Sequence, residues 1–266
     1  MNISEQFKTS GRDALREQRA FAARMNGDVQ DLAPADRLAH LRSQLRGRIV
    51  LTTSFGIEDQ VILHFAHARG LAIDVVTLDT GRLFPETYAL WAETERRYGH
   101  RIQAIYPKDD RLAVLVHEHG INGFYDSVEA RIACCQVRKV EPLGRALAGA
   151  KGWITGLRAD QSRDRVGAGI VSVDAHHRVI KFNPLFDWTR DMVVDFARAH
   201  DVPVNPLHDQ GFVSIGCAPC TRAIAPGEPE RAGRWWWEES GKKECGLHWN
   251  SGRPSPVAHA EASAAR

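Results

Sequence analysis

The 266-residue sequence contains no apolar run that approaches the roughly 20 residues a membrane-spanning helix requires. Its first residues lack the apolar core of a secretory signal peptide, and their acidic side chains are atypical of a transit peptide. Basic and acidic residues nearly balance, at 35 against 33, so the sequence lacks the large basic excess of a general nucleic-acid binder. Together these absences predict a cytoplasmic protein with neither a membrane nor a nucleic-acid partner.

Cysteine is also scarce, with five residues in the chain. In a reducing compartment thiols do not form a disulfide framework, so their placement needs another explanation. Cys134 and Cys135 are adjacent, Cys217 and Cys220 are separated by two residues, and Cys245 stands alone. Four thiols therefore form two pairs, and one is left over.

Short β-branched runs alternate with helical periodicities through most of the chain. We expect helical structure over residues 1–47, with Pro34 opening a helix. Strands are expected at 49–53, 73–78, 101–105 and 153–155, with two more near 170–182, and helices at 58–68, 85–98, 109–119 and after the capping residue Thr189. Such alternation predicts an α/β fold, in which a mostly parallel sheet carries helices on both faces.

The same pattern divides the chain into four parts. An N-terminal helical segment covers 1–47, and an α/β domain covers 48–215. From Pro203 onward the periodicity fades, and Cys, Pro, Gly and Trp dominate. We expect 216–248 to form a mobile C-terminal segment that carries thiol chemistry, and 249–266, rich in Ala and Ser, to be a disordered tail.

Hydroxyl and glycine residues follow the first predicted strand. The turn 52–59, which includes Thr53, Ser54 and Gly56, allows backbone N–H groups and a helix N-terminus to face an anion. It is not a P-loop, because no Gly-Lys-Ser/Thr follows. The alternative is an ordinary turn in which Ser54 caps the helix. Ligands of parallel sheets bind beyond the carboxyl ends of the strands, which is where this turn lies.

Two further strand ends carry comparable segments. Residues 78–82, beginning with Leu78, can hold an adenine or a ribose by backbone hydrogen bonds, or Asp79 and Gly81 can simply shape a tight turn. Residues 155–165 concentrate three arginines, whose forked donors match the oxygens of sulfate and phosphate. The alternative for this segment is a solvated loop whose arginines pair with neighbouring aspartates.

The four paired thiols predict an inorganic cofactor. Thiolates are ligands of iron–sulfur clusters and of zinc, and the C-x-x-C spacing suits either. Adjacent cysteines are uncommon in zinc modules, whose ligands come as spaced pairs, whereas two neighbouring thiolates can reach two irons of one [4Fe–4S] cube. We therefore favour the cluster over a zinc site, and over a redox disulfide between Cys217 and Cys220.

The fifth cysteine lies in the segment KKECGLH, with two lysines before it and His248 after it. A free thiol of pKa about 8.5 is only slightly ionised at neutral pH, and neighbouring positive charge raises its thiolate fraction. Cys245 is thus a candidate nucleophile on a glycine-flanked segment. The alternative is an incidental cysteine near the end of the chain.

Seven segments, in this order, resemble one known family: SFGIED, LDTGR, CCQVRK, TGLRADQS, CAPC, GRWWWE and KECGLH. Over residues 48–248 the sequence is similar to the assimilatory, thioredoxin-dependent adenylyl-sulfate reductases. The resemblance implies a Rossmann-like adenine nucleotide α-hydrolase fold, related to the ATP pyrophosphatases, and self-association into a homo-oligomer. It also implies a [4Fe–4S] cluster on Cys134, Cys135, Cys217 and Cys220.

The resemblance implies a reaction as well. The family reduces adenosine 5′-phosphosulfate (APS) to sulfite and AMP through an S-sulfocysteine, and Cys245 matches its nucleophile. Reduced thioredoxin, or a glutaredoxin-like donor, then releases the sulfite. An anionic thiolate approaching an anionic sulfate needs preorganised cations. The family's basic positions are matched by Lys139, Arg165, Arg231 and Arg234.

The strand-end segments complete the expected substrate site. Its residues are Thr53, Ser54, Gly56, Leu78, Lys139, Gly156, Arg158, Arg165, Arg231 and Arg234. Lys139 lies only a few residues from Cys134 and Cys135, so we expect the electrostatics of the cluster and of the substrate to be coupled. The cluster itself is expected to act structurally and electrostatically rather than as an electron donor.

Three other functions stay open at this point. A 3′-phosphoadenylyl-sulfate (PAPS) reductase is the sister enzyme, but members of that group usually lack the four cluster thiols. A tRNA-thiolating ATP pyrophosphatase can share the fold and a cluster, but SFGIED replaces its Ser-Gly-Gly-rich loop and the net charge is near neutral. The third is a zinc-stabilised nucleotide-binding module without catalysis.

Overall fold

The computed structural model describes residues 3–161 and 169–238. Its helices are α1 (Ile3–Val29), α2 (Pro34–Gln44), α3 (Ile57–Ala68), α4 (Pro85–Tyr98), α5 (Asp109–His119), α6 (Val128–Cys135), α7 (Glu141–Ala146) and α8 (Arg190–Ala199). Its strands are β1 (Ile49–Thr53), β2 (Asp74–Leu78), β3 (Gln103–Ile105), β4 (Gly152–Ile154), β5 (Val171–Asp174) and β6 (Val179–Phe182). A π-helical turn, η2 (Gln136–Val140), joins α6 to α7, and short 3₁₀ helices include η1 (Gly123–Tyr125), η3 (Ala159–Gln161), η5 (Pro206–Gln210) and η6 (Ala218–Cys220).

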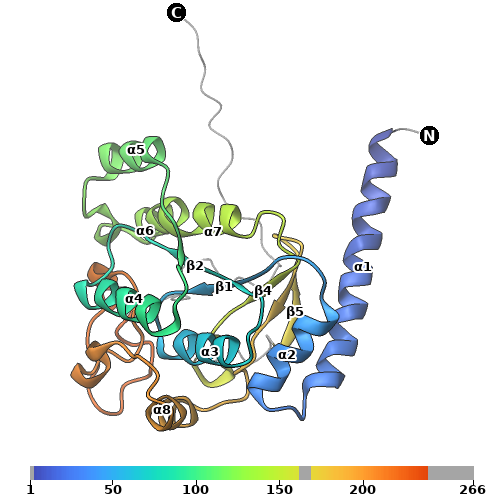
Figure 1. Ribbon diagram of the computed structural model, residues 1–266. Coiled ribbons are helices and arrows are strands. Elements are labelled where there is room, and N and C mark those ends of the chain that lie inside the picture. Colours follow the sequence, from blue (N-terminus) through green and yellow to red (C-terminus); the bar gives the residue numbers. More distant parts are fainter. Residues whose placement is uncertain (1–2, 162–168, 239–266) are drawn as a thin grey trace, which may run out of the picture.

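In the described part of the chain the strands form one six-stranded sheet, in the order β3-β2-β1-β4-β6-β5 (Figure 1). All neighbouring strands pair in parallel except β5, which runs antiparallel to β6. The chain passes from β1 to β2 on one side and returns as β4 on the other, so the strand order reverses at β1. In open parallel sheets a ligand binds at such a reversal, beyond the carboxyl ends of the strands.

Helices cover both faces of the sheet (Figure 1). Neighbouring residues of β1 point to opposite faces, as in any strand. Leu51 packs in a core with residues of α2, α3, α4 and α8, whereas Val50 packs in a second core with residues of α7. Both side chains are fully buried, which is typical of a strand covered on both sides. The predicted fold class is therefore confirmed.

The edge strand β5 is covered by α1 (Figure 1). Asn26 on this helix donates from Nδ2 to the Val171 carbonyl at 2.7 Å and accepts from the Val171 N–H at 2.9 Å. One amide side chain thus takes the place of a further strand at this point of the edge. An occupied edge is protected from pairing with another chain. No helix among residues 3–161 and 169–238 is long and apolar enough to cross a membrane.

Most predicted elements agree with the structure to within two residues at either end. Pro34 begins α2, and the Thr189 side chain caps α8 by accepting a hydrogen bond from the Met192 N–H. The helices between 128 and 146 were not predicted. Here η2 interrupts the α-helical repeat with a wider turn, so no single period of 3.6 residues runs through the segment.

Candidate active site and thiol cavity

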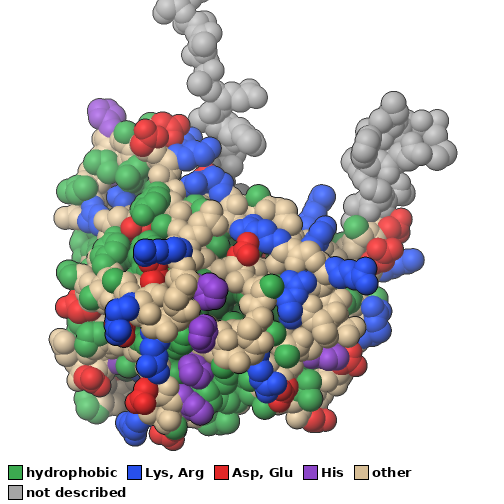
Figure 2. Space-filling model, in the orientation of Figure 1, with side chains coloured by type: hydrophobic (Ala, Val, Ile, Leu, Met, Phe, Trp, Pro, Cys, Tyr) green, Lys and Arg blue, Asp and Glu red, His purple; other side chains and the backbone are tan. Residues whose placement is uncertain are grey.

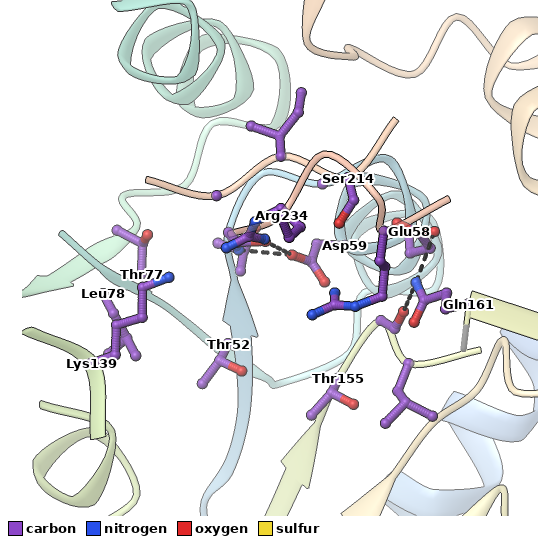
Figure 3. Close-up of a pocket in the computed structure, with 18 of the residues that line it drawn as sticks. Thr52, Glu58, Asp59, Thr77, Leu78, Lys139, Thr155, Gln161, Ser214 and Arg234 are labelled. Atoms are coloured by element: carbon purple, nitrogen blue, oxygen red, sulfur yellow. Dashed lines mark hydrogen bonds between the residues drawn. The ribbon is translucent and has the colours of Figure 1, made fainter. Parts of the chain in front are cut away.

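A pocket opens beyond the carboxyl ends of β1, β2 and β4, at the reversal of strand order. Thr53, Leu78 and Thr155, which end or directly follow these strands, line it. Further walls come from the start of α3, from η2 and from the segments 213–216 and 230–235. Figure 3 shows side chains from these separate parts of the sequence arranged around one space. The expected ligand edge of the sheet therefore carries a pocket.

The turn after β1 is held together by its own side chains. Phe55 adopts a left-handed conformation with φ of 60° and stacks on Trp91 at 5.7 Å. This conformation is rare for a bulky residue and is typical of functional turns. The Asp59 carboxylate accepts hydrogen bonds from the Ser54 N–H at 2.7 Å and from its hydroxyl at 3.0 Å. Gly56, rather than Ser54, is the N-cap of α3, so the alternative of Ser54 as the cap is wrong.

Asp59 brings a weakly acidic group to the pocket wall. Burial raises the pKa of its carboxyl to about 6, while the hydrogen bonds from Ser54 oppose this shift and the Glu58 charge adds to it. Desolvation is the dominant cause because the side chain lies at the base of the turn, away from water. The carboxyl therefore changes its protonation close to physiological pH.

Gly156 permits the close approach of β4 to the start of α3. A Cβ atom at this position would lie 2.5 Å from Asp59 Oδ1 and 2.8 Å from Glu58 Cβ. Separations this short are not tolerated between real atoms, so any side chain would displace the helix or its carboxylates. The predicted substrate residue Gly156 thus fixes the shape of the pocket as well as lining it.

Arg158 lies behind the pocket wall and is fully buried. Its guanidinium binds three carboxylates: Glu58 through Nε at 2.9 Å, Glu230 through Nη2 at 2.9 Å, and Asp160 through Nη1. Glu58 and Glu230 line the pocket, whereas Arg158 is not among its described lining residues. The structure therefore gives Arg158 the geometry of a positioning residue, which holds two acidic side chains in the wall.

Basic side chains occupy another part of the pocket. Figure 3 shows Lys139, which comes from η2, and Arg234, which comes from the segment before the last described residues. Arg231, from the same segment as Arg234, also lines the pocket. The Arg234 guanidinium packs on the Trp235 ring, 4.7 Å from its centroid. Gly216 makes room for it, because a Cβ there would collide with the guanidinium. Of the four cations predicted to bind an anionic substrate, the three that lie among the described residues thus line one pocket.

The four paired cysteines line a second, smaller cavity beside the pocket. Cys134 and Cys135 end α6, while Cys217 and Cys220 flank and end η6. All but the half-buried Cys134 are buried. Five basic side chains, and no acidic one, are among the described residues that line this cavity. They are Arg82, Arg131, Arg138, Lys139 and Arg234.

The surroundings of Cys217 favour a thiolate. Burial raises the pKa of a thiol, yet the charge of Lys139, a hydrogen bond with Thr80 Oγ1 and the charge of Arg234 hold the pKa of Cys217 below its usual value. Burial and the neighbouring Cys217 instead raise the pKa of Cys220 to about 12. Among the residues described, no three His, Cys, Asp or Glu side chains are arranged to hold a single metal ion.

The comparisons with known proteins agree with this geometry. Residues 48–223 match the family model described as the phosphoadenosine phosphosulfate reductase domain. The chain belongs to this reductase family. It is 51% identical over 237 residues to the adenosine 5′-phosphosulfate reductase of Agrobacterium fabrum, which covers 89% of this chain and 91% of that relative. It is 53% identical over 212 residues to the enzyme of the same name from Allochromatium vinosum, covering 79% and 83% respectively.

A solved structure of the same reductase family supports the fold. The phosphoadenylyl-sulfate reductase of Candida auris superposes with a TM-score of 0.65 over 76% of this chain and 96% of that chain, at 24% identity. At this identity the likeness concerns the fold alone. The predicted relationship to the reductase family is confirmed, and with it the oxidoreductase class, which leaves no support for a tRNA-thiolating enzyme.

Eight of the ten predicted substrate residues of this reductase-family chain line the pocket. They are Thr53, Ser54, Gly56, Leu78, Lys139, Gly156, Arg231 and Arg234. Arg158 lies behind the wall, and Arg165 and the predicted nucleophile Cys245 lie outside the described residues. Sequence reasoning missed Glu230, which no local pattern marks, because only the fold brings it to Arg158, 72 residues away.

Proposed function

We propose that this chain reduces APS to sulfite and AMP in sulfate assimilation, with reduced thioredoxin or a glutaredoxin-like protein as the two-electron donor. One observation carries the proposal: Lys139, Arg234 and Trp235 line both the strand-end pocket and the four-thiol cavity. A nucleotide pocket, a set of cations and a group of thiols thus meet at one place. The relatives from Agrobacterium fabrum and Allochromatium vinosum carry the name of this reaction.

The pocket offers different chemistry to the two ends of APS. Strand-end residues such as Leu78 and Gly156 supply backbone groups suited to the adenosine. Lys139, Arg231 and Arg234 supply the positive charge that a phosphosulfate requires. These cations also reduce the repulsion between the incoming thiolate and the anionic sulfate group, because they are already in place before the reaction begins.

The proposed chemistry proceeds in two steps. The Cys245 thiolate attacks the sulfur of APS, an S–S bond forms, the bond from sulfur to the bridging oxygen breaks, and AMP leaves with that oxygen. A thiolate of reduced thioredoxin then attacks the Cys245 sulfur, and sulfite leaves with the electron pair of the S–S bond. The second thiol of thioredoxin closes its own disulfide and frees Cys245, so one dithiol supplies the two electrons.

In this proposal Cys134, Cys135, Cys217 and Cys220 would hold a [4Fe–4S] cluster, which the clustering of four thiols in one cavity supports. A cube does not need three ligands on one metal ion, because each thiolate binds a different iron. The five surrounding cations suit an anionic cluster with four thiolate ligands. When bound, the cluster would supply negative charge and a rigid tie between α6 and η6, and no electron of the reaction passes through it.

Lys139 is the residue through which the two cavities interact. Its charge lowers the pKa of Cys217 on one side, and its side chain lines the nucleotide pocket on the other. A more negative thiol cavity therefore holds the ammonium group more strongly in place, and a fixed ammonium offers substrate a preorganised cation. This is the electrostatic coupling expected from the sequence, and it is part of the proposal.

Turnover of two nucleotides tests the proposed function. Purified protein is supplied with reduced thioredoxin and either APS or PAPS, and sulfite is measured. We expect sulfite from APS, with a kcat/KM well above that for PAPS. A preference for PAPS would assign the chain to the sister activity, and no sulfite from either would refute reduction altogether.

Iron and acid-labile sulfide, measured on the same anaerobic preparation, test the cofactor. Four irons and four sulfides per chain are expected of one cube. A colourless protein that contains zinc instead would contradict the cluster. Protein freed of metal that kept its fold and its full turnover would refute the structural and electrostatic role.

A further inference from the structure

Large hydrophobic side chains are exposed unevenly over the surface. Of the ten that are exposed within the described ranges, five belong to the segment 121–132 or to Trp236. We call these five the α6 patch: Ile121, Tyr125, Val128, Ile132 and Trp236. Figure 2 shows hydrophobic side chains gathered at the left of the molecule, over the region of α5 and α6 in Figure 1.

The α6 patch brings together residues of α6, of η1 and of the segment after Trp235. Val128 and Ile132 are four residues apart on α6, so they lie on the same face of the helix. Tyr125 belongs to η1, which packs on α6, and its ring centroid lies 6.4 Å from that of Trp236. Two parts of the chain more than a hundred residues apart thus contribute to it.

The patch is also rigid, because its aromatic residues are fixed from below. The Tyr125 hydroxyl donates to the Pro219 carbonyl at 2.7 Å, and its ring lies 4.5 Å from that of Trp237. Pro219 stands between Cys217 and Cys220 and lines the thiol cavity, so Tyr125 ties the patch to the wall of that cavity. Exposed apolar surface fixed in this way is typical of a protein-binding site, whose energetic centre is often Tyr or Trp.

The chain that leads to Cys245 begins beside this patch. Glu238 is the last described residue, two residues after Trp236 and seven before Cys245. Seven residues span at most about 25 Å even when fully extended. Glu238 is itself held to α6 by Arg131, with 2.6 Å between Nε and Oε1. A protein whose thiol reaches the Cys245 sulfur must therefore come within this reach of Glu238, which lies two residues from the patch residue Trp236.

We infer that the α6 patch is the docking surface for the reductant, a small protein whose exposed dithiol is framed by apolar surface. This inference rests on the proposed function, since only the second chemical step requires such a partner. The patch provides affinity and orientation for the dithiol protein, whereas the nucleotide pocket binds APS. Changes in the patch should consequently alter the use of the protein reductant and leave the use of APS unchanged.

A pair of double variants tests the inference in the full-length holoenzyme. Ile121→Gln with Ile132→Gln removes two exposed members of the patch. Met192→Gln with Val204→Gln is the matched control, since both residues are similarly exposed and lie on or after α8, on the other face of the sheet. For each protein we would measure the KM for reduced thioredoxin, the KM for APS, and the rate supported by dithiothreitol.

The patch variant is expected to raise the KM for thioredoxin by about tenfold, which corresponds to the loss of one interface anchor. Its KM for APS and its dithiothreitol rate should equal those of the wild type, as should every value of the control. An unchanged KM for thioredoxin would overturn the inference. A dithiothreitol-supported rate that falls as much as the thioredoxin-supported rate would also overturn the inference. The patch would then act on the chain's own C-terminal segment and not on the protein reductant.

Sedimentation of the same proteins adds a further outcome. A patch variant that loses self-association but keeps its KM for thioredoxin would make the patch an interface between copies of this chain, which overturns the inference. If the wild type reduces APS with dithiothreitol but the patch variant has the same KM for thioredoxin as the wild type, only the docking surface is refuted. A wild type that reduces APS with neither reductant refutes the proposed function, and the inference falls with it.

Discussion

Arg131 and Glu238 form a buried ion pair that fastens the last described residue to α6, the helix that carries Cys134 and Cys135. Two hydrogen bonds join them, from Nε at 2.6 Å and from Nη2 at 3.2 Å, and the Arg131 guanidinium also lies over the Trp235 ring at 4.8 Å. The chain therefore enters the segment of the predicted nucleophile from a fixed point beside the thiol cavity.

Removing one partner of this pair should destabilise the protein strongly. Glu238→Ala leaves the buried Arg131 charge without its carboxylate, and we expect the free energy of unfolding to fall by about 3 to 5 kcal/mol. Arg131→Met combined with Glu238→Leu should recover much of this loss, since no buried charge remains. Denaturant titrations of the single and double variants measure both effects. A loss within experimental error for Glu238→Ala would show that the pair does not hold this segment.

Gly156→Ala should distort the pocket, because the new Cβ would stand 2.5 Å from Asp59 Oδ1. We expect a loss of stability of about 1 to 3 kcal/mol together with weaker AMP binding. Gly144→Ala is the matched control: its Cβ meets nothing within 4 Å, and alanine should stabilise α7 by up to about 1 kcal/mol. Titration calorimetry with AMP and thermal unfolding measure the two effects. Wild-type affinity in Gly156→Ala would contradict the close approach.

Asp59 should give the protein a pH-dependent stability of identifiable sign. The pKa of its carboxyl is about 6 in the folded protein against 3.8 ordinarily, so between these values the folded state binds more protons than the unfolded one. The contribution of Asp59 is thus fully present below pH 3.8 and is lost as the pH rises through 6, by about 3 kcal/mol in all.

Comparison with Asp59→Asn isolates this contribution, since the amide oxygen can still accept from the Ser54 N–H. From acidic to neutral pH, the unfolding free energy of the variant should rise relative to that of the wild type. Denaturant titrations of both proteins at several pH values give the difference directly, because other groups cancel. Parallel pH profiles would show that the carboxyl titrates normally.

Lys139→Ala should damage catalysis much more than folding. Removing a preorganised cation from the site of a charged transition state typically costs about 100-fold, and we expect a fall of this size in kcat/KM for APS. Lys139→Arg should restore part of the activity because the charge remains. Lys108→Ala is the control, since this exposed lysine is not among the described residues that line the pocket and its ion pair with Glu141 is long, at 3.8 Å. An unchanged kcat/KM in Lys139→Ala would remove Lys139 from the site.

The parts of the fold that the sequence predicts well are those governed by local chemistry. β-Branched runs such as 49–53 mark buried strands, Pro34 and Thr189 mark helix starts, and the turns after the strands fall at the edge where parallel sheets bind ligands. The same edge brings Ser54, Leu78 and Gly156 to one pocket, which is why reasoning from strand ends found most of its wall.

The parts that local chemistry does not determine are those made by long-range contacts. For residues 155–165 the sequence left open a ligand-binding loop or arginines paired with neighbouring aspartates, and Arg158 does pair with Asp160. Its other two carboxylate partners, Glu58 and Glu230, lie 100 and 72 residues away, so no local pattern marks them. The π turn after Cys135 likewise has no sequence signal of its own. This turn carries Lys139, whose side chain lines both cavities.

The central claim is that Cys245 carries the sulfonate between APS and the reductant, and intact mass spectrometry tests it most directly. Holoenzyme is mixed with APS in the absence of any reductant and weighed. We expect a gain of one SO₃ group, which disappears when reduced thioredoxin is added and never forms in Cys245→Ser. An adduct of the same mass in Cys245→Ser would place the nucleophile elsewhere and contradict the account.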